Sequence, residues 1–156
     1  MSGQKPSGPM RLGPHTGTVG KRILALDVGE ARIGMAMSDP TGQIAQPLHT
    51  FERETVAADV ARVLETARAY EVATIVVGLP LGPENELTPQ AKKVRRFARA
   101  LRRESQIPVA LYDERLTTAE AQELLIAADV SRARRKRVID SVAAAAILRG
   151  YLDSQG

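Results

Sequence analysis

An apolar, strand-like run with one aspartate in its middle most strongly constrains how this chain folds. Residues 21–28 are almost continuously apolar, which is typical of a central strand buried on both faces of a sheet. Asp27 interrupts the run, and a carboxylate is costly to desolvate unless it is paired, hydrogen-bonded or bound to a metal. Asp27 therefore needs a partner that folding brings to it.

Two more strands follow the first across short turns. Residues 32–38 form the second strand, and a turn sequence at 39–42 leads into a third strand at about 44–51. Pro47 cannot donate a hydrogen bond to a neighbouring strand, so the third strand belongs at an edge of the sheet. Three sequential strands joined by short turns predict an antiparallel meander.

Beyond residue 52, apolar residues recur at helical spacing and are separated by two short apolar runs. The pattern predicts helices to about Tyr70, over about 88–104, from Thr117 to about 128, and from about Val138 to Leu152. It also predicts strands at 73–77 and 108–113, which right-handed crossovers make parallel to the first strand. The expected fold is an α/β domain over residues 21–153, a five-stranded mixed sheet in the order 3-2-1-4-5 with helices on both faces. This is the ribonuclease H-like arrangement.

Composition excludes several kinds of protein. No apolar run is long enough to cross a bilayer, and residues 1–20 lack the apolar core of a secretory signal, so we expect a flexible tail and a cytoplasmic protein. The absence of cysteine excludes disulfides, thiolate nucleophiles and cysteine-ligated zinc. A net charge of +4 and a pI near 9.8 suggest a polyanionic partner such as nucleic acid, although genome base content alone could produce the same excess of arginine.

Two further acids stand at the ends of apolar elements. Glu114 follows the fifth strand, and Asp140 opens the predicted last helix at the border of its apolar stripe. In this strand order Glu114 lies two strands from Asp27, about 9.6 Å by strand spacing, a gap that a glutamate side chain plus a cation can close. Three carboxylates this close raise one another's pKa, whereas Mg²⁺ or Mn²⁺ would offset the repulsion. The stripe comprises Ile139, Val142, Ala143, Ala146, Ile147 and Gly150.

Other chemistries have little support in the sequence. The two histidines are His15 in the tail and His49 on the expected edge strand, so a Ser-His-Asp triad or a histidine-rich zinc site is disfavoured. Carboxylates, divalent ions and arginines remain, and these are the components of two-metal phosphodiester hydrolysis. Taken singly, Glu114 could instead pair with Arg115, and Asp140 could be favoured by the helix dipole.

Four ordered segments, LALDVGEARIG, VVGLP, LYDERLTTAEAQ and VIDSVAAAAIL, resemble the YqgF/RuvX family of Holliday-junction resolvases and pre-16S ribosomal RNA nucleases, from Lys21 to Asp153. The resemblance implies a cytoplasmic nuclease of ribosomal RNA processing or of DNA recombination and repair. It further implies Mg²⁺ or Mn²⁺ as cofactor, with Asp27, Glu114 and Asp140 as catalytic metal ligands. Roles near the site are implied for Gly29, Gly34, Arg115 and Thr118, the last two as substrate contacts.

The chain departs from the better-known junction resolvases of this superfamily at two places. Those proteins carry a second acid one turn after the helix aspartate, where this chain has Ala143 and Ala144, so metal coordination is expected to be leaner, with Asp113 or water filling in. The loop at 81–87 also lacks the usual glycine-centred turn, which could alter substrate fit.

A basic segment immediately precedes Asp140 and could grip phosphates that flank the cut. Its cations are Arg132, Arg134, Arg135, Lys136 and Arg137. A solvated helix start is the alternative for this segment, and a solvated face is the favoured interpretation of the cations over 88–104.

Two other classes of protein compete with the nuclease. Asp27-x-Gly29 followed by Gly34 also resembles the phosphate loop of actin-like and sugar-kinase proteins, but those proteins duplicate the domain and 156 residues cannot hold two copies. A catalytically weak RNA-binding ribosome-assembly or transcription factor on the same fold stays open. The sequence leaves open whether a ribosomal RNA precursor or a four-way DNA junction is the substrate, and symmetric junction cutting would need a homodimer.

Overall fold

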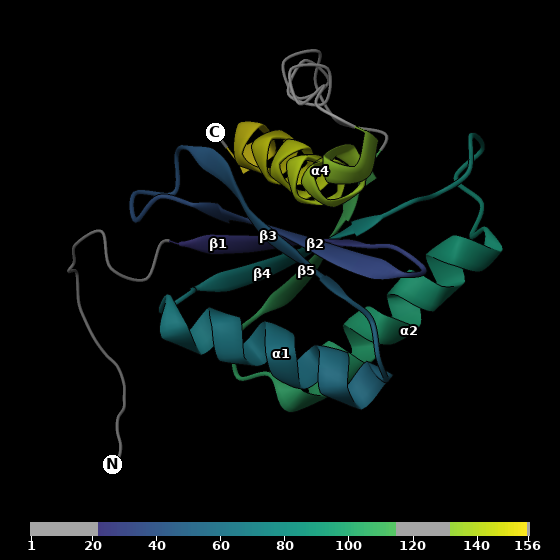
Figure 1. Cartoon of the computed structure of the whole chain (residues 1–156), viewed down its shortest axis with the longest axis horizontal. Helices are drawn as coiled ribbons and strands as arrows, with labels where there is room; N and C mark the ends of the chain where they lie inside the picture. Colours follow the sequence, from purple (N-terminus) through teal and green to yellow (C-terminus); the bar gives the residue numbers. More distant parts are fainter. Residues whose placement is uncertain (1–21, 115–131, 156) are drawn as a thin grey trace.

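Five strands form one mixed sheet with the order β3-β2-β1-β4-β5 (Figure 1). The computed structural model describes residues 22–114 and 132–155, with the backbone alone over 132–140. The strands are β1 (Ile23–Val28), β2 (Arg32–Ser38), β3 (Ala45–Glu52), β4 (Thr74–Leu79) and β5 (Val109–Asp113). β1, β2 and β3 pair antiparallel, whereas β4 and β5 run parallel to β1, which confirms the predicted order and meander.

Helices cover both faces of the sheet, as predicted. α1 (Val56–Ala69) and α2 (Pro89–Glu104) lie on one face, and α4 (Arg132–Gln155) lies across the other (Figure 1). Thr55 and Thr88 begin α1 and α2 as N-caps, each accepting a hydrogen bond from a backbone N–H three residues later. No helix in the part of the chain that the structure describes is long and apolar enough to span a membrane.

The strand alternation of β1 directs its side chains into two separate cores. Leu24 and Leu26 are fully buried on the side of α1 and α2, where they pack with larger apolar residues of the other strands. Ala25 is fully buried on the side of α4. Because alternate residues share a face, Asp27 also belongs to the α4 side, beyond the end of that core.

The second core is a contact between small residues. Ala25 and Ala36 of the sheet meet Ala144 and Ala145 of α4, and all four are completely buried. Val76, Tyr112, Ile147 and Leu148 complete this cluster. Small side chains on both surfaces allow α4 to lie close to the sheet, over the same face to which Asp27 belongs.

The predicted start of the last helix was wrong, and its buried face is wider than predicted. α4 begins at Arg132, six residues before the predicted Val138, so Asp140 lies inside the helix and the basic segment forms its first turns. Arginine and lysine are good helix formers, but the prediction followed the apolar period, which starts only at Val138. The buried face is wider than the predicted stripe. Val142, Ala146, Ile147 and Gly150 are buried as predicted and Ala143 is partly exposed, but Ala144, Ala145 and Leu148 are also fully buried.

The third strand lies at the sheet edge, as Pro47 predicted. Pro47 pairs with Ala36, immediately after a register shift between Met35 and Ala36. A bulge of this kind accommodates the missing N–H donor. The predicted tail at 1–20 and the predicted helix from Thr117 to about 128 lie outside the described residues.

Candidate active site

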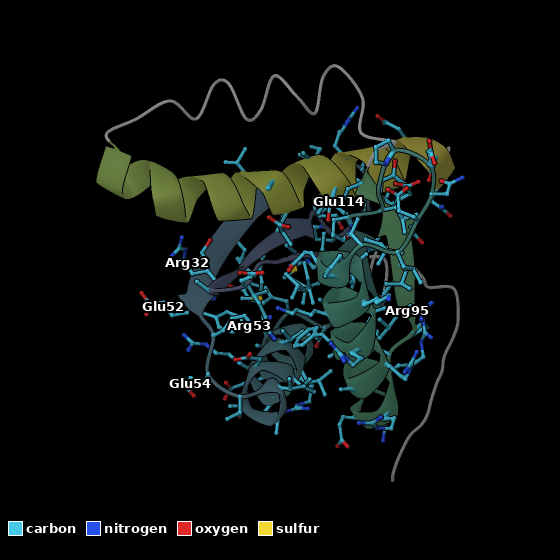
Figure 2. All side chains as sticks on the ribbon, turned by 90° about the vertical axis from the view of Figure 1, so that its right-hand side faces the viewer. Arg32, Glu52, Arg53, Glu54, Arg95 and Glu114 are labelled. Atoms are coloured by element: carbon cyan, nitrogen blue, oxygen red, sulfur yellow. The ribbon has the colours of Figure 1, made fainter. Side chains whose placement is uncertain are left out.

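Three acidic residues lie where parallel strands end, at one edge of the sheet. Asp27 lies near the carboxyl end of β1, while Asp113 and Glu114 end β5 and follow it. β1, β4 and β5 are parallel, so their carboxyl ends meet at the same edge, where open α/β sheets commonly bind ligands. Figure 2 looks onto this edge, with Glu114 beneath α4.

A glycine in the strand between them lets the acidic side chains approach α4. A Cβ on Gly78 of β4 would lie 2.4 Å from Ile147 Cδ1 and 3.0 Å from Glu114 Oε2. Neither contact can be accommodated without movement, so the absence of a side chain at this position holds open the space that Glu114 occupies. Gly34 of β2 is the backbone partner of Asp27 on its other side. Asp27 is thus flanked on one side by Gly34 and separated from Glu114 by Gly78.

Glu114 is the most perturbed carboxyl group at this edge. Burial, then the charge of Asp27, then that of Asp113 raise the pKa of Glu114 to about 7. Asp27 and Glu114 are therefore close enough to repel each other when both are ionised. Partly buried carboxylate oxygens with an excess of negative charge are the donor set that hard divalent cations such as Mg²⁺ and Mn²⁺ prefer. The residues present fit such an ion.

The third predicted acid belongs to α4. Asp140 lies one helical turn before Ala144 and two before Ile147, the residue that contacts Gly78. Its helical position is therefore on the face that packs on the sheet, but its side chain lies outside the described atoms. Among the side chains that are described, no three acidic or histidine residues are grouped closely enough to hold a metal, so Asp113 does not complete a set with Asp27 and Glu114.

The predicted substrate contacts lie outside the described residues or in the part of α4 for which only the backbone is described. Arg115 and Thr118 lie outside the described residues. The cations of the basic segment, Arg132, Arg134, Arg135, Lys136 and Arg137, lie in the first turns of α4, and their side chains are not described.

The turn that follows Asp27 is held from the opposite side of the sheet. Arg53 Nη1 donates to the carbonyl of Gly29 at 3.0 Å, and Gln90 Nε2 donates to the carbonyl of Val28 at 3.1 Å. A Cβ on Gly29 would lie 2.9 Å from the carbonyl oxygen of Arg32, which explains the glycine. Arg53 and Gln90 were missed from the sequence, because only their contacts across the fold distinguish them from surface polar residues.

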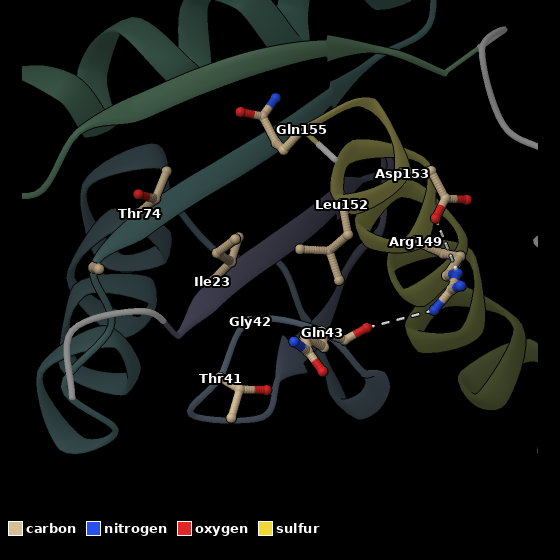
Figure 3. A pocket seen from close by; sticks show the side chains of 10 residues that line it. Ile23, Thr41, Gly42, Gln43, Thr74, Arg149, Leu152, Asp153 and Gln155 are labelled. Atoms are coloured by element: carbon tan, nitrogen blue, oxygen red, sulfur yellow. Dashed lines mark hydrogen bonds and ion pairs between the residues drawn. The ribbon is translucent and has the colours of Figure 1, made fainter. Parts of the chain in front are cut away.

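A separate hollow lies at the other end of the sheet (Figure 3). It has a volume of about 500 Å³ and is lined by Ile23 and Thr74, which begin β1 and β4, and by the end of α4. Arg149 is already committed there, to Asp153 at 3.4 Å and to the carbonyl of Gln43 at 3.5 Å. The acids that we consider catalytic are at the carboxyl ends of the strands, so this hollow is not part of their site.

The sheet order and the placement of its helices define a ribonuclease H-like protein. Thermus thermophilus RuvC bound to a Holliday junction superposes with a TM-score of 0.54 at 18% identity, over 86% of this chain and 94% of that one. The fowlpox virus Holliday junction resolvase gives 0.53 at 12% identity, over 86% and 99%. These likenesses establish the shared fold.

The chain belongs to the RuvX family. The family model, described as RuvX: Holliday junction resolvase, matches residues 21–154. A protein of Moorella thermoacetica is 53% identical over 135 residues, which are 86% of this chain and 96% of the relative. One from Thermoanaerobacter pseudethanolicus is 51% identical over 86% of this chain and 97% of the relative. Both relatives are provisionally named pre-16S rRNA nuclease.

Proposed function

We propose that this protein is a metal-dependent endonuclease that hydrolyses phosphodiester bonds of structured nucleic acid. The observation that carries the proposal is the placement of Glu114, a partly buried carboxyl group at the carboxyl edge of the sheet, beside Asp27 and Asp113, whose charges help burial to raise its pKa. Clustered carboxylates at this edge are suited to hold divalent ions. Membership of a family described as Holliday junction resolvases supports the same activity.

In this proposal Asp27, Glu114 and Asp140 hold Mg²⁺ or Mn²⁺, two ions in the full site. When bound, the ions supply Lewis acidity and lower the pKa of the attacking water. Glu114 must give up its proton for its oxygens to act as ligands, and the β1–β2 turn keeps Asp27 in place through Arg53 and Gln90. Gly78 leaves the space that the Glu114 side chain occupies beside Ile147 of α4.

The proposed substrates are pre-16S ribosomal RNA and four-way DNA junctions. The names of the relatives support the first, and the family description supports the second. The basic first turns of α4, with Arg115 and Thr118, would contact the phosphates that flank the cut. A symmetric cut of a junction would additionally require two copies of the chain.

A cleavage assay of the full chain on both substrates tests the proposal. Labelled precursor RNA and a four-way junction are incubated with Mg²⁺, Mn²⁺ or EDTA. We expect cleavage that depends on the divalent ion and that falls by at least about 100-fold, roughly 2.7 kcal/mol of transition-state stabilisation, in Asp27→Asn, Glu114→Gln and Asp140→Asn. Glu54→Gln is the matched control, because Glu54 is an exposed carboxylate at the same edge (Figure 2).

Three outcomes would contradict the proposal. Cleavage that persists in EDTA would show that the reaction needs no divalent ion. Undiminished cleavage by one acid variant would show that its residue is not a metal ligand. If the wild-type protein binds RNA without cutting either substrate, and the three acid variants bind equally well, then the chain is an RNA-binding factor on a nuclease fold.

A further inference from the structure

A groove on the face opposite α4 is lined by basic side chains. It lies between the start of α1 and the length of α2, with a volume of about 600 Å³. Its lining contains five cations and no carboxylate. The lining residues are Arg53, Val56, Lys93, Arg96, Phe97, Arg99, Ala100 and Arg103.

One end of this basic groove meets the edge that carries the acids. Arg53 donates to the carbonyl of Gly29, and Lys93 Nζ lies 3.8 Å from Glu30 Oε2. Gly29 and Glu30 form the β1–β2 turn, two and three residues after Asp27. Figure 2 shows Arg53 at the same end of the molecule as Glu114. The basic groove therefore starts beside the candidate active site and leads away from it along α2.

Most of the positive charge in the groove is uncompensated. Arg53 is paired with Asp59 at 3.1 Å and lies over the Phe97 ring at 5.4 Å, so it is a fixed part of the wall. Both side chains of the Lys93–Glu30 ion pair are exposed to solvent, so the pair contributes little to stability. Within the described residues, Arg96, Arg99 and Arg103 have no acidic partner at ion-pair distance. Three arginines are thus available to an anionic ligand.

The spacing of these cations suits a phosphate backbone. Lys93, Arg96, Arg99 and Arg103 recur every three or four residues, which aligns them along one side of α2. From Lys93 to Arg103 the helix rises about 15 Å, at about 1.5 Å per residue. Along the axis of a B-form duplex one strand presents a phosphate about every 3.4 Å, so this length matches a few successive phosphates of a strand that runs along it.

We propose that the basic groove binds the sugar-phosphate backbone of a strand that flanks the cleavage site. That the bound strand leads from the cleavage site into the groove rests on the function proposed above. Binding of the strand in the groove does not itself require cleavage. Phosphate contacts of this kind position a substrate without reading its sequence. The cations that the sequence suggested to be a solvated face then extend the contact with the substrate beyond the acids.

Binding measurements with long and short substrates test this proposal. The wild type and Arg96→Gln/Arg99→Gln are titrated, without divalent ions, with a hairpin RNA and with the same hairpin carrying an added flanking strand. Arg62→Gln/Arg95→Gln is the control, because these two cations of α1 and α2 are exposed but do not line the groove. Melting temperatures of both variants verify that the fold is retained.

We expect the flanking strand to strengthen wild-type binding by about tenfold, and the groove variant to lose most of that gain. The slope of log K against log salt should fall by about two for the groove variant on the longer RNA. The control variant should keep the full gain. This experiment measures binding and not cleavage. If the cleavage assay described above failed, the nuclease function would be disproved, but the binding of a strand in the groove could still be tested.

An equal gain from the flanking strand in the wild type and the groove variant would overturn the inference and leave the proposed nuclease intact. A greater loss in the control than in the groove variant would place the strand outside the groove. Tighter binding of poly-glutamate than of RNA of equal charge would assign the groove to an acidic protein partner instead.

Discussion

Glu114 changes its charge near neutral pH, because burial and the charges of Asp27 and Asp113 raise its pKa to about 7. In an unfolded chain the same group has its ordinary pKa of 4.5. Below the unfolded value Glu114 is protonated in both states and has no effect on folding. As the pH rises from there to about 7, only the unfolded state loses the proton freely, so the stability of the metal-free protein decreases.

Replacing Glu114 by glutamine should therefore remove a pH-dependent penalty. We expect metal-free Glu114→Gln to melt at a higher temperature than the wild type at pH 8, and the difference to shrink as the pH falls from about 7 to about 4.5 and to be absent below that. Calorimetry in EDTA across this range measures the effect. Glu54→Gln, which removes an exposed carboxylate, is the control. If the melting temperatures of the wild type and Glu114→Gln changed with pH in the same way, the pKa of Glu114 would not be raised in the folded protein.

Gly78 is the residue whose enlargement should be most harmful to the site. A Cβ there would meet Ile147 Cδ1 and Glu114 Oε2 at 2.4 and 3.0 Å, so Gly78→Ala must displace the buried Ile147 side chain or the acid. We expect a loss of about 1–3 kcal/mol of stability and a large loss of cleavage. Gly82→Ala is the control, because a Cβ there meets only the end of the exposed Glu86 side chain. Equal denaturation midpoints and rates for the two variants would refute this account.

The acids of the proposed site could be singled out from the sequence, whereas the residues around them could not. Asp27 and Glu114 stand out because an acid at the end of an apolar strand is unusual. Gly78, Arg53 and Gln90 have no such signal, because their roles depend on contacts between segments far apart in the chain.

At the scale of elements, the β2–β3 turn depends on one carboxylate. Asp39 accepts hydrogen bonds from the backbone N–H groups of Gln43 at 2.8 Å and Ile44 at 2.7 Å, and also from Thr41. These bonds, the one from the Thr41 hydroxyl first, hold the pKa of Asp39 well below its usual value. The turn was predicted from the sequence, since aspartate, proline and glycine each favour one.

Asp39→Ala should lower the melting temperature at neutral pH. A depressed pKa contributes stability above the unfolded value of 3.8, and this contribution is lost as the pH falls below it, so the difference between variant and wild type should diminish in acid. Asp153→Asn is the control, because that exposed carboxylate makes an i,i+4 ion pair with Arg149. A drop in melting temperature as large for Asp153→Asn would show that general charge, rather than the turn, is responsible.

Element boundaries were predictable where capping residues mark them. Thr55 and Thr88 are the N-caps that begin α1 and α2, and the second helix was predicted to within a residue. The start of α4 was missed because a run of arginines is helical without being apolar, so periodicity does not extend to it. Asp140 is consequently an interior residue of α4, and a first-turn interaction with the helix dipole no longer explains it.

At the scale of the molecule, the proposed site draws its ligands from β1, from the residue after β5 and from α4. The strand order that brings these elements together followed from apolar patterns and short connections alone. The basic groove could not be predicted in this way. The sequence shows the cations of α2, but not that Arg53 and Phe97 line a groove together with them.

With three clear acids, one of two ions would be held largely by water and by the substrate. We therefore expect weak Mg²⁺ binding by the free protein, faster cleavage with Mn²⁺, which tolerates looser geometry, and poor cleavage of plain duplex DNA. Calorimetric titration and a panel of plain, branched and unpaired substrates measure these properties. Tight Mg²⁺ binding without nucleic acid, or efficient cutting of plain duplex, would reveal a fourth ligand.

The close packing of alanines between α4 and the sheet has a consequence for protein engineering. Ala25, Ala36, Ala144 and Ala145 are the smallest side chains that can fill this layer, and they leave no margin for enlargement. A bulkier residue would lift the helix that carries Asp140 away from the strand that carries Asp27. Thermostabilising substitutions should therefore be sought between the sheet and α1 or α2, where misfits leave the distance between these two acids unchanged.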